Sequence, residues 1–190
     1  MWDALNFGLS KYYNNKKYLE GITQQLQYVF WKGAVVLLQT IGFSVSAELL
    51  NHAISEKPSN LMIDNGFIIE SIKKDETFRK KIKNTLIKNK EKNQISITEI
   101  ISFNSGDLQA SIHNATIHVE GIKQNNNWYL KIEIIDEYDF TDLKELQEYI
   151  DSKIKGFILS TANNAAMLST SCGVLNTYSL KIKFDYEVGE

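Results

Sequence analysis

Eight carboxylates gather within nineteen residues of this chain, from Glu133 to Asp151. At the centre of the stretch, Asp136, Tyr138 and Asp139 lie where an alternating apolar segment stops and no helix has yet begun. Neighbouring carboxylates repel one another, so that one of them takes up a proton or the pair recruits a cation. Either outcome suits hydrolysis, with Asp136 and Asp139 as general acid and base or as ligands of a hard ion such as Mg²⁺. We therefore take these three residues as candidate catalytic residues, with Tyr138 as a positioning hydroxyl.

The same acidic stretch also has a purely structural interpretation. Asp142 and Glu145 have the spacing of a capping box, which favours a helix beginning there. Tyr138 and Phe140 suit a hydrophobic core, and they occupy positions where a calcium loop of the EF-hand type requires ligands. The sequence therefore excludes an EF-hand and leaves the catalytic and the structural interpretations side by side.

His118 is the other candidate for acid-base chemistry. It lies in a segment, 112–120, that we expect to pair with the strand 128–136 across a polar loop at 121–127. Opposed strands bring side chains within about 5 Å of each other, and a carboxylate beside an imidazole is one route to a general base. The alternative is an ordinary polar strand residue. Cys172 has no basic neighbour in the sequence, so we interpret it as a packed thiol. Neither glycine-rich phosphate-loop pattern is present, so we expect no nucleotide cofactor. We also expect no haem.

Charge is distributed unevenly along the 190 residues, whose formal net charge is −2. Residues 73–92 carry nine basic and three acidic groups, whereas the chain after residue 92 is acidic. Arg79 is the one arginine, and aromatic residues do not alternate with the lysines, so nucleic-acid binding is disfavoured. We interpret the basic segment as the solvated face of a helix. The functional alternative is that it contacts an anionic membrane surface.

The most apolar segment runs from Tyr28 to Ala47 and contains Lys32. Its uncharged part, 33–47, is shorter than the roughly 20 residues that cross a bilayer, so the pattern predicts a buried core helix, with membrane contact as the alternative. The first residues have no basic segment followed by an apolar core and a cleavage site, so we expect no Sec signal peptide. We expect synthesis in the cytoplasm, with any export through a dedicated secretion system.

The spacing of apolar residues indicates the elements that would position these candidates. Apolar residues at three- and four-residue steps between Leu19 and Leu37 predict a first helix. Ser46 is the expected N-cap of a second helix over 46–54. Asp75 is the expected N-cap of a third helix, whose apolar stripe consists of Phe78, Ile82 and Leu86. Alternation then predicts strands near 95–103, 112–120, 128–136 and 178–187, with helices at about 142–172 before the last. This gives an α+β fold, in which a helical region, 1–92, packs on a mainly antiparallel sheet or partial barrel, 93–190, with an inserted C-terminal helical pair.

The strand that enters Asp136-Glu137-Tyr138-Asp139-Phe140 resembles the Asp-x-Tyr-Asp signature of colicin M-like bacteriocin domains. The likeness extends over residues 100–190 in the order of elements. It implies a Mg²⁺-dependent enzyme that cleaves lipid II, the lipid-linked peptidoglycan precursor, with Asp136, Tyr138 and Asp139 in the acidic signature. That family follows the signature with a His-Arg pair, for which residues 141–148 offer no counterpart.

Three functional hypotheses follow. The first is an antibacterial effector or toxin, a hydrolase of a cell-envelope precursor, with an immunity protein as its cognate partner. The second is a non-enzymatic module that perturbs a membrane or binds a protein, with Tyr28–Ala47 and the basic segment as its working parts. The third is a binding protein that neutralises a partner toxin through its acidic half.

Overall fold

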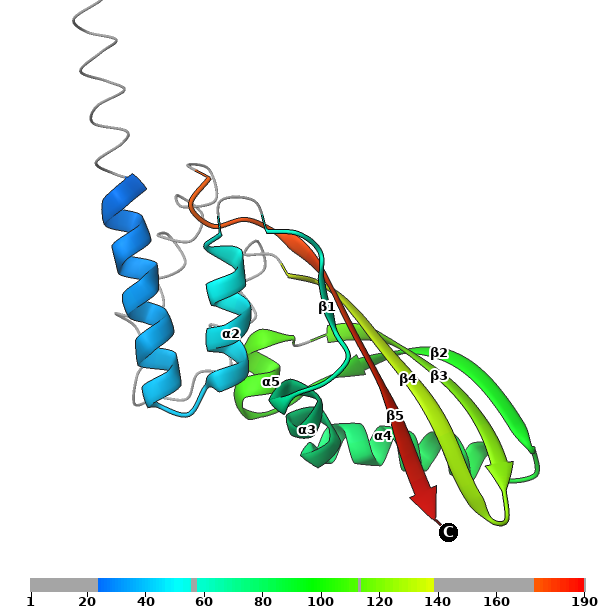
Figure 1. The fold of residues 1–190 in the computed structure, drawn as a ribbon. Coiled ribbons are helices and arrows are strands. Elements are labelled where there is room, and N and C mark those ends of the chain that lie inside the picture. Colours follow the sequence, from blue (N-terminus) through cyan, green and yellow to red (C-terminus); the bar gives the residue numbers. More distant parts are fainter. Residues whose placement is uncertain (1–23, 56–57, 113, 139–172, 190) are drawn as a thin grey trace, which may run out of the picture.

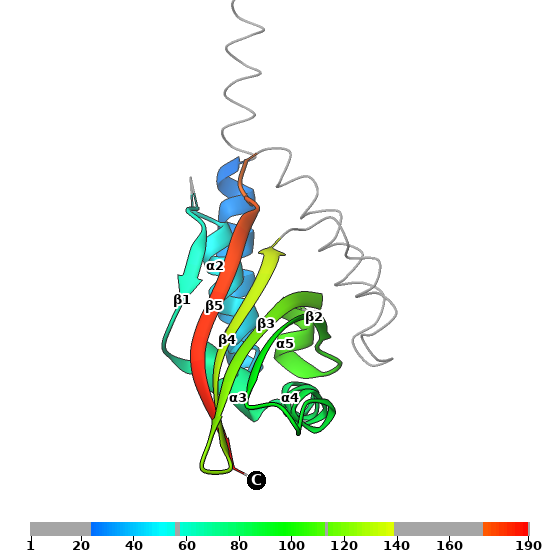
Figure 2. The same cartoon turned by 90° about the vertical axis from the view of Figure 1, so that its right-hand side faces the viewer.

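In this computed structural model, residues 24–55, 58–112, 114–138 and 173–189 are described. The described elements are a helix over residues 24–40, then α2 (Ser44–Ala53), β1 (Leu61–Ile63), α3 (Phe67–Lys74), α4 (Glu76–Lys88), β2 (Gln94–Ser102), α5 (Gly106–Ser111), β3 (Asn114–Gln124), β4 (Asn127–Tyr138) and β5 (Tyr178–Gly189). The strands form one sheet in the order β1-β5-β4-β3-β2, which appears from left to right in Figure 2. The expected α+β fold is thereby confirmed. The helical pair expected at 142–172 lies outside the described residues.

Side-chain alternation gives the sheet one buried and one open face. In β4 the residues Trp128, Leu130, Ile132 and Ile134 are almost fully buried, and so are the residues paired with Ile132 and Ile134, which are Val119, Ile117, Phe184 and Ile182. We call this the helix face, because α3 and α4 lie on that side of the sheet (Figure 1). On α4 the expected stripe of Phe78, Ile82 and Leu86 is buried, and Phe78 contacts the rings of Phe184 and Tyr186 at 5.7 and 5.3 Å between centroids.

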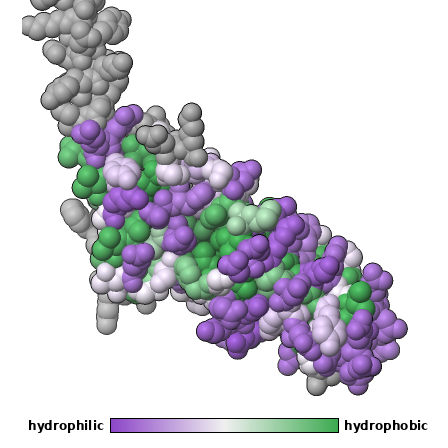
Figure 3. Space-filling view, viewed as in Figure 1, coloured by the Kyte–Doolittle hydropathy of each residue, from purple (hydrophilic) through white to green (hydrophobic). Residues whose placement is uncertain are grey.

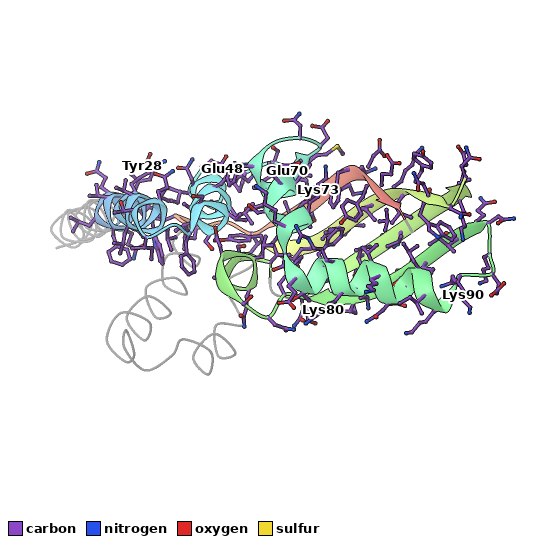
Figure 4. All side chains as sticks on the ribbon, turned by 90° about the horizontal axis from the view of Figure 1, so that it is seen from below. Tyr28, Glu48, Glu70, Lys73, Lys80 and Lys90 are labelled. Carbon is purple, nitrogen blue, oxygen red and sulfur yellow. The ribbon has the colours of Figure 1, made fainter. Side chains whose placement is uncertain are left out.

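The basic segment is confirmed as a largely solvated helix face. Asp75 caps α4 as expected, accepting a hydrogen bond from the backbone N–H of Phe78 at 3.0 Å. Figure 4 shows Lys80 and Lys90 near opposite ends of α4, directed away from the strands. Lys81 and Lys73 are partly covered, since Lys81 forms an ion pair with Glu99 of β2 and Lys73 Nζ lies 5.5 Å from the centre of the Phe184 ring.

Sequence reasoning missed three short elements. β1 pairs in parallel with β5, with Leu61 opposite Leu180, so the region expected to be entirely helical contributes a strand to the sheet. The pair α3 and α5 were also missed, because each has fewer than ten residues and too few repeats to show a period. Short elements of this kind are set by packing on the sheet rather than by their own propensity.

The hairpin between β3 and β4 is tighter than the loop expected at 121–127. The turn consists of Asn125 and Asn126, whose φ angles of 49° and 68° are typical of a two-residue hairpin. Gly121 lies inside β3, where a Cβ atom would come within 2.5 Å of Leu130 Cδ2 and 3.1 Å of Ile95 Cγ1. Gly121 is therefore required by close packing on the helix face and not by a turn.

The first helix ends at Gly42, whose φ of 87° favours glycine. The backbone N–H of Phe43 donates to the carbonyl of Leu38 at 2.8 Å and closes the last turn. The helix then packs on α2 through its buried residues Trp31 and Val35. No helix among the described residues is long and apolar enough to cross a membrane.

Candidate functional site

The end of β4 carries the described part of the candidate acidic signature. Asp136 and Tyr138 lie opposite Leu180 and Tyr178 of β5, so both side chains are on the helix face of the sheet. Glu137, between them, is on the open face and accepts a hydrogen bond from Ser179 Oγ at 3.1 Å. The third candidate, Asp139, lies outside the described residues.

An aromatic cluster surrounds Tyr138. Its ring stacks on that of Tyr178 with centroids 5.1 Å apart, and the His52 ring of α2 meets the Tyr178 ring in a T-shaped contact with centroids 4.5 Å apart. The Tyr178 hydroxyl donates to the backbone carbonyl of Leu49 at 2.9 Å, which ties the start of β5 to α2. This cluster fixes the orientation of the Tyr138 ring.

Electrostatics keep both phenols protonated. Burial raises the pKa of Tyr138, and the carboxylates of Asp107 and Asp136 raise it further. Burial likewise raises the pKa of Tyr178, with Tyr138 and Asp136 as the next contributors. The Tyr138 phenol therefore stays protonated at ordinary pH and is not a base.

Asp107 of α5 is the neighbouring carboxylate that sequence reasoning did not select. Its Oδ2 accepts from the backbone N–H of Val45 at 2.6 Å, and its Oδ1 accepts from the N–H and Oγ of Ser46 at 2.8 and 2.6 Å. Asp107 thus caps α2 across 61 residues. The expectation that Ser46 itself is the cap was wrong, because Ser46 lies inside α2, which begins at Ser44.

The missed contributions could not be read from local sequence. Asp107 resembled one residue of a turn, and nothing adjacent to it in the chain shows that its target is α2. Tyr178 begins the last predicted strand, but its pairing with Tyr138 depends on the register between β4 and β5.

His118 lies on the opposite face from Asp136 and Tyr138. In β3 it is paired with Glu133 of β4 and Thr98 of β2, and its Nδ1 is 2.7 Å from Thr98 Oγ1. We expected His118 to lie close to the carboxylates at the end of β4. This prediction was wrong for Asp136, because the register between β3 and β4 places His118 beside Glu133. His113 lies outside the described residues.

Charged side chains on the open face pair with one another. Lys181 Nζ lies 2.7 Å from Glu133 Oε1, and Lys183 Nζ lies 3.6 Å from Glu133 Oε2. The hydrogen bond from Lys181 holds the pKa of the Glu133 carboxyl below its usual range, although partial burial opposes the shift. Glu133 is therefore ionised at neutral pH and is a poor proton donor.

A shallow hollow of about 750 Å³ lies further along the open face, towards the β3–β4 hairpin. Ser96, Glu120, Tyr129, Lys131 and Asp185 contribute side chains of both charges and one exposed aromatic ring. None of these residues belongs to the predicted catalytic set, and the hollow is at the other end of β4 from Asp136.

No protein-family model matches this chain, and no curated protein matches it significantly. Among solved structures, a mutant of syringacin M from Pseudomonas syringae pv. tomato aligns with a TM-score of 0.36 and 14% sequence identity, over 75% of this chain and 51% of that one. The chain thus spans about half the length of that neighbour. This likeness assigns the chain to no family.

Proposed function

We propose that the chain is the effector part of a bacterial antagonistic toxin that hydrolyses a lipid-linked precursor of the cell envelope such as lipid II. One observation carries the proposal: Asp136 and Tyr138 share a face at the very end of a rigid central strand. Rigid strands that lead into a loop are good catalytic positions, because the strand aims the side chains while the loop leaves room for substrate. The Asp-x-Tyr-Asp pattern to which both belong supports the same activity.

In this proposal the side chains have separate roles. Asp136 and Asp139 act as acid and base or hold Mg²⁺, which would polarise the pyrophosphate of the substrate. The protonated Tyr138 hydroxyl donates a hydrogen bond that orients the reacting group. Asp107 is not a suitable ligand, because both of its carboxylate oxygens accept hydrogen bonds from the start of α2.

Few of the described side chains at this site could bind a metal ion. Within the described ranges, no three His, Cys, Asp or Glu side chains are close enough together to hold an ion. The described residues thus offer Asp136 as the carboxylate ligand, and the proposal takes the second from Asp139. Oxygen ligands of this kind are those that Mg²⁺ prefers.

The experiment is a toxicity assay with a matched control. Asp136→Asn and Asp139→Asn, each exported to the periplasm of a test bacterium, should abolish killing while the thermal unfolding of purified protein stays close to that of the wild type. Glu137→Gln is the control, because Glu137 has the same chemistry between these residues but faces the open side; it should still kill. Equal killing by all three variants would rule out the catalytic role of the acidic signature.

A second candidate function is supported by the surroundings of Tyr138. The stack of Tyr138 on Tyr178 and the hydrogen bond that Asp136 Oδ1 accepts from the Glu137 N–H are also what a structural strand end requires. The working surface would then be the open face, with its hollow of mixed charge, and the chain would be a protein-binding module such as a toxin-neutralising partner. Protection of cells against a co-produced toxin, lost on Lys131→Glu but not on Asp136→Asn, would identify this function.

A further inference from the structure

The helix over residues 24–40 has a hydrophobic surface that the other described residues leave uncovered. Leu26, Val29, Phe30, Val36, Leu37 and Ile41 have 48–67% of their side-chain surface exposed. With Gly33 and Thr40 they follow one line along the helix at three- and four-residue steps, and we call these eight residues the outer stripe. Figure 3 shows green hydrophobic surface at the end of the molecule where this helix lies, against a largely purple far end.

The outer stripe differs from an ordinary solvated helix face. The opposite side of the same helix is already occupied, since Trp31 and Val35 are buried. No acidic residue occurs between residues 21 and 47, and Lys32 lies to one side, where its Nζ donates to Asn51 Oδ1 at 2.8 Å. A helix that is apolar on two sides is normally covered on both, and isolated proteins seldom expose a continuous apolar patch of this extent.

The spacing of the stripe is symmetric about Gly33. Counting outwards from it, Phe30 matches Val36, Val29 matches Leu37, and Leu26 matches Thr40. Two copies of this helix that cross antiparallel at Gly33 would therefore pair these six residues with their matches on the other copy, whereas Ile41 would lie opposite Gln25. A Cβ atom at Gly33 would meet nothing within 4 Å, so the missing side chain serves no contact within the described molecule. It does allow a second helix to approach closely, which partly offsets the cost of glycine in a helix.

The area of the stripe suits this arrangement. An aromatic side chain buries about 150–250 Å² and the aliphatic side chains of the stripe bury less, so the six partly exposed residues present at most about 600 Å² per copy. A symmetric pair would bury at most about 1,200 Å², the lower end of the range for specific interfaces. A two-fold pair is also the commonest form of self-association, and it covers the same surface on both copies.

We propose that the outer stripe is the interface of a homodimer, in which helices 24–40 of two chains cross antiparallel at Gly33. The occupant is a second copy and not a lipid surface, because a flat bilayer requires neither a glycine at the centre nor matched residues on either side of it. The stripe also lacks the lysines and arginines that accompany the apolar face of helices lying on anionic membranes.

The mass of the full-length chain in solution tests the proposal. Analytical ultracentrifugation over 1–100 μM should show a dimer for the wild type. Leu37→Glu places a charge in the interface twice and should raise the dimer dissociation constant at least about 100-fold. Ile100→Glu is the matched control, since Ile100 is 60% exposed on the open face of the sheet, and it should leave the mass unchanged. A wild type that is monomeric throughout this range would overturn the proposal.

The variant Gly33→Leu distinguishes a specific helix crossing at Gly33 from nonspecific hydrophobic association. The variant adds apolar surface without a clash inside the chain, so association through undirected hydrophobic contact or through lipid would become stronger. The proposed crossing requires the opposite result, a weaker dimer, because the new side chains would hold the two helices apart. A dimer that persists in Gly33→Leu, or a wild type that remains monomeric and sediments with phosphatidylcholine or phosphatidylglycerol vesicles, would refute the crossing.

Cross-linking tests the direction of the helices. In a Cys172→Ser background, Val29→Cys and Leu37→Cys chains should form a disulfide with each other when mixed, since matched residues lie across the interface within bridging distance. Each variant alone should form far less. Equal cross-linking of Val29→Cys with itself would contradict the antiparallel arrangement.

Discussion

The two faces of the sheet hold similar titratable residues in opposite environments. On the helix face, Asp136 and Tyr138 lie against α2 and α5, where burial raises the pKa of the phenol. On the open face, His118 and Glu133 lie among lysines and hydroxyls, and an ion pair lowers the pKa of Glu133. Because neighbouring residues of β4 point to opposite faces, a shift of one position along the strand moves a side chain from one environment to the other. The chemistry available to each carboxylate is therefore decided by strand parity more than by its neighbours in the sequence.

The largest test of this difference compares adjacent isoleucines of β4. Ile134 on the helix face is fully buried, and Ile135 on the open face is partly exposed. Ile134→Ala should lower the free energy of unfolding by about 2–5 kcal/mol, because it removes buried methyl groups and leaves a cavity. Ile135→Ala should cost less than half as much. Urea unfolding of both variants measures the difference, and equal losses would mean that the two faces are not distinct.

Gly121 tests how closely the helix face is packed. Gly121→Ala introduces a Cβ atom within 2.5 Å of Leu130 Cδ2, so Leu130 or the strand must move. We expect a loss of about 1–3 kcal/mol in the free energy of unfolding, as for other overpacked sites. Gly189→Ala is the control, since its Cβ atom would meet only Asn127 Oδ1 at 3.5 Å, an ordinary contact distance, and the change should be nearly neutral. A stable Gly121→Ala protein would show that the helix face can accommodate the methyl group.

The tyrosine pair predicts a loss of stability at alkaline pH. A phenol whose pKa is raised by folding contributes stability that is complete below its unfolded pKa of about 10 and is lost as the pH rises above that value. Tyr138→Phe keeps the ring but removes this group, so it should flatten the fall in unfolding free energy by up to about 1.4 kcal/mol per pH unit above pH 10. Urea unfolding between pH 9 and pH 11.5 measures the slopes. Tyr129→Phe, an exposed tyrosine of the open face, serves as the comparison, and identical slopes for the two variants would exclude a titrating role for Tyr138.

The smallest effect is expected on the open face. Glu133→Gln removes both ion pairs with Lys181 and Lys183, yet it should change the free energy of unfolding at pH 7 by less than about 1 kcal/mol, because all three side chains reach solvent. The pKa of Glu133 is lowered in the folded state, so its contribution is present above the ordinary carboxyl pKa and disappears as the pH falls through the lowered value. The wild type and the variant should therefore become equally stable in acid. If Glu133→Gln lowered the free energy of unfolding by several kcal/mol at pH 7, this prediction would be wrong, and Glu133 would have to be much less exposed to solvent than the structure shows.

Much of the fold could be predicted from periodicity, and the exceptions have physical reasons. Alternation along β4 and β5 and the four-residue stripe of α4 are long enough to identify the elements and their inward residues. β1 has three residues and α5 has six, so neither shows a period, and both owe their existence to the sheet and to α2. The position of Gly121 was misread because a glycine beside a run of asparagines looks like part of a turn.

The candidate site shows the same division more sharply. The acidic signature, its place at the end of a strand, and the shared parity of Asp136 and Tyr138 follow from the sequence, because side chains two residues apart in a strand point the same way. Only the tertiary structure brings Tyr178, His52 and Asp107 towards Tyr138 and moves His118 to the other face. The physical reason is that strand register and helix docking depend on how the whole core packs, and such contacts between distant residues leave no mark on the local spacing of either partner.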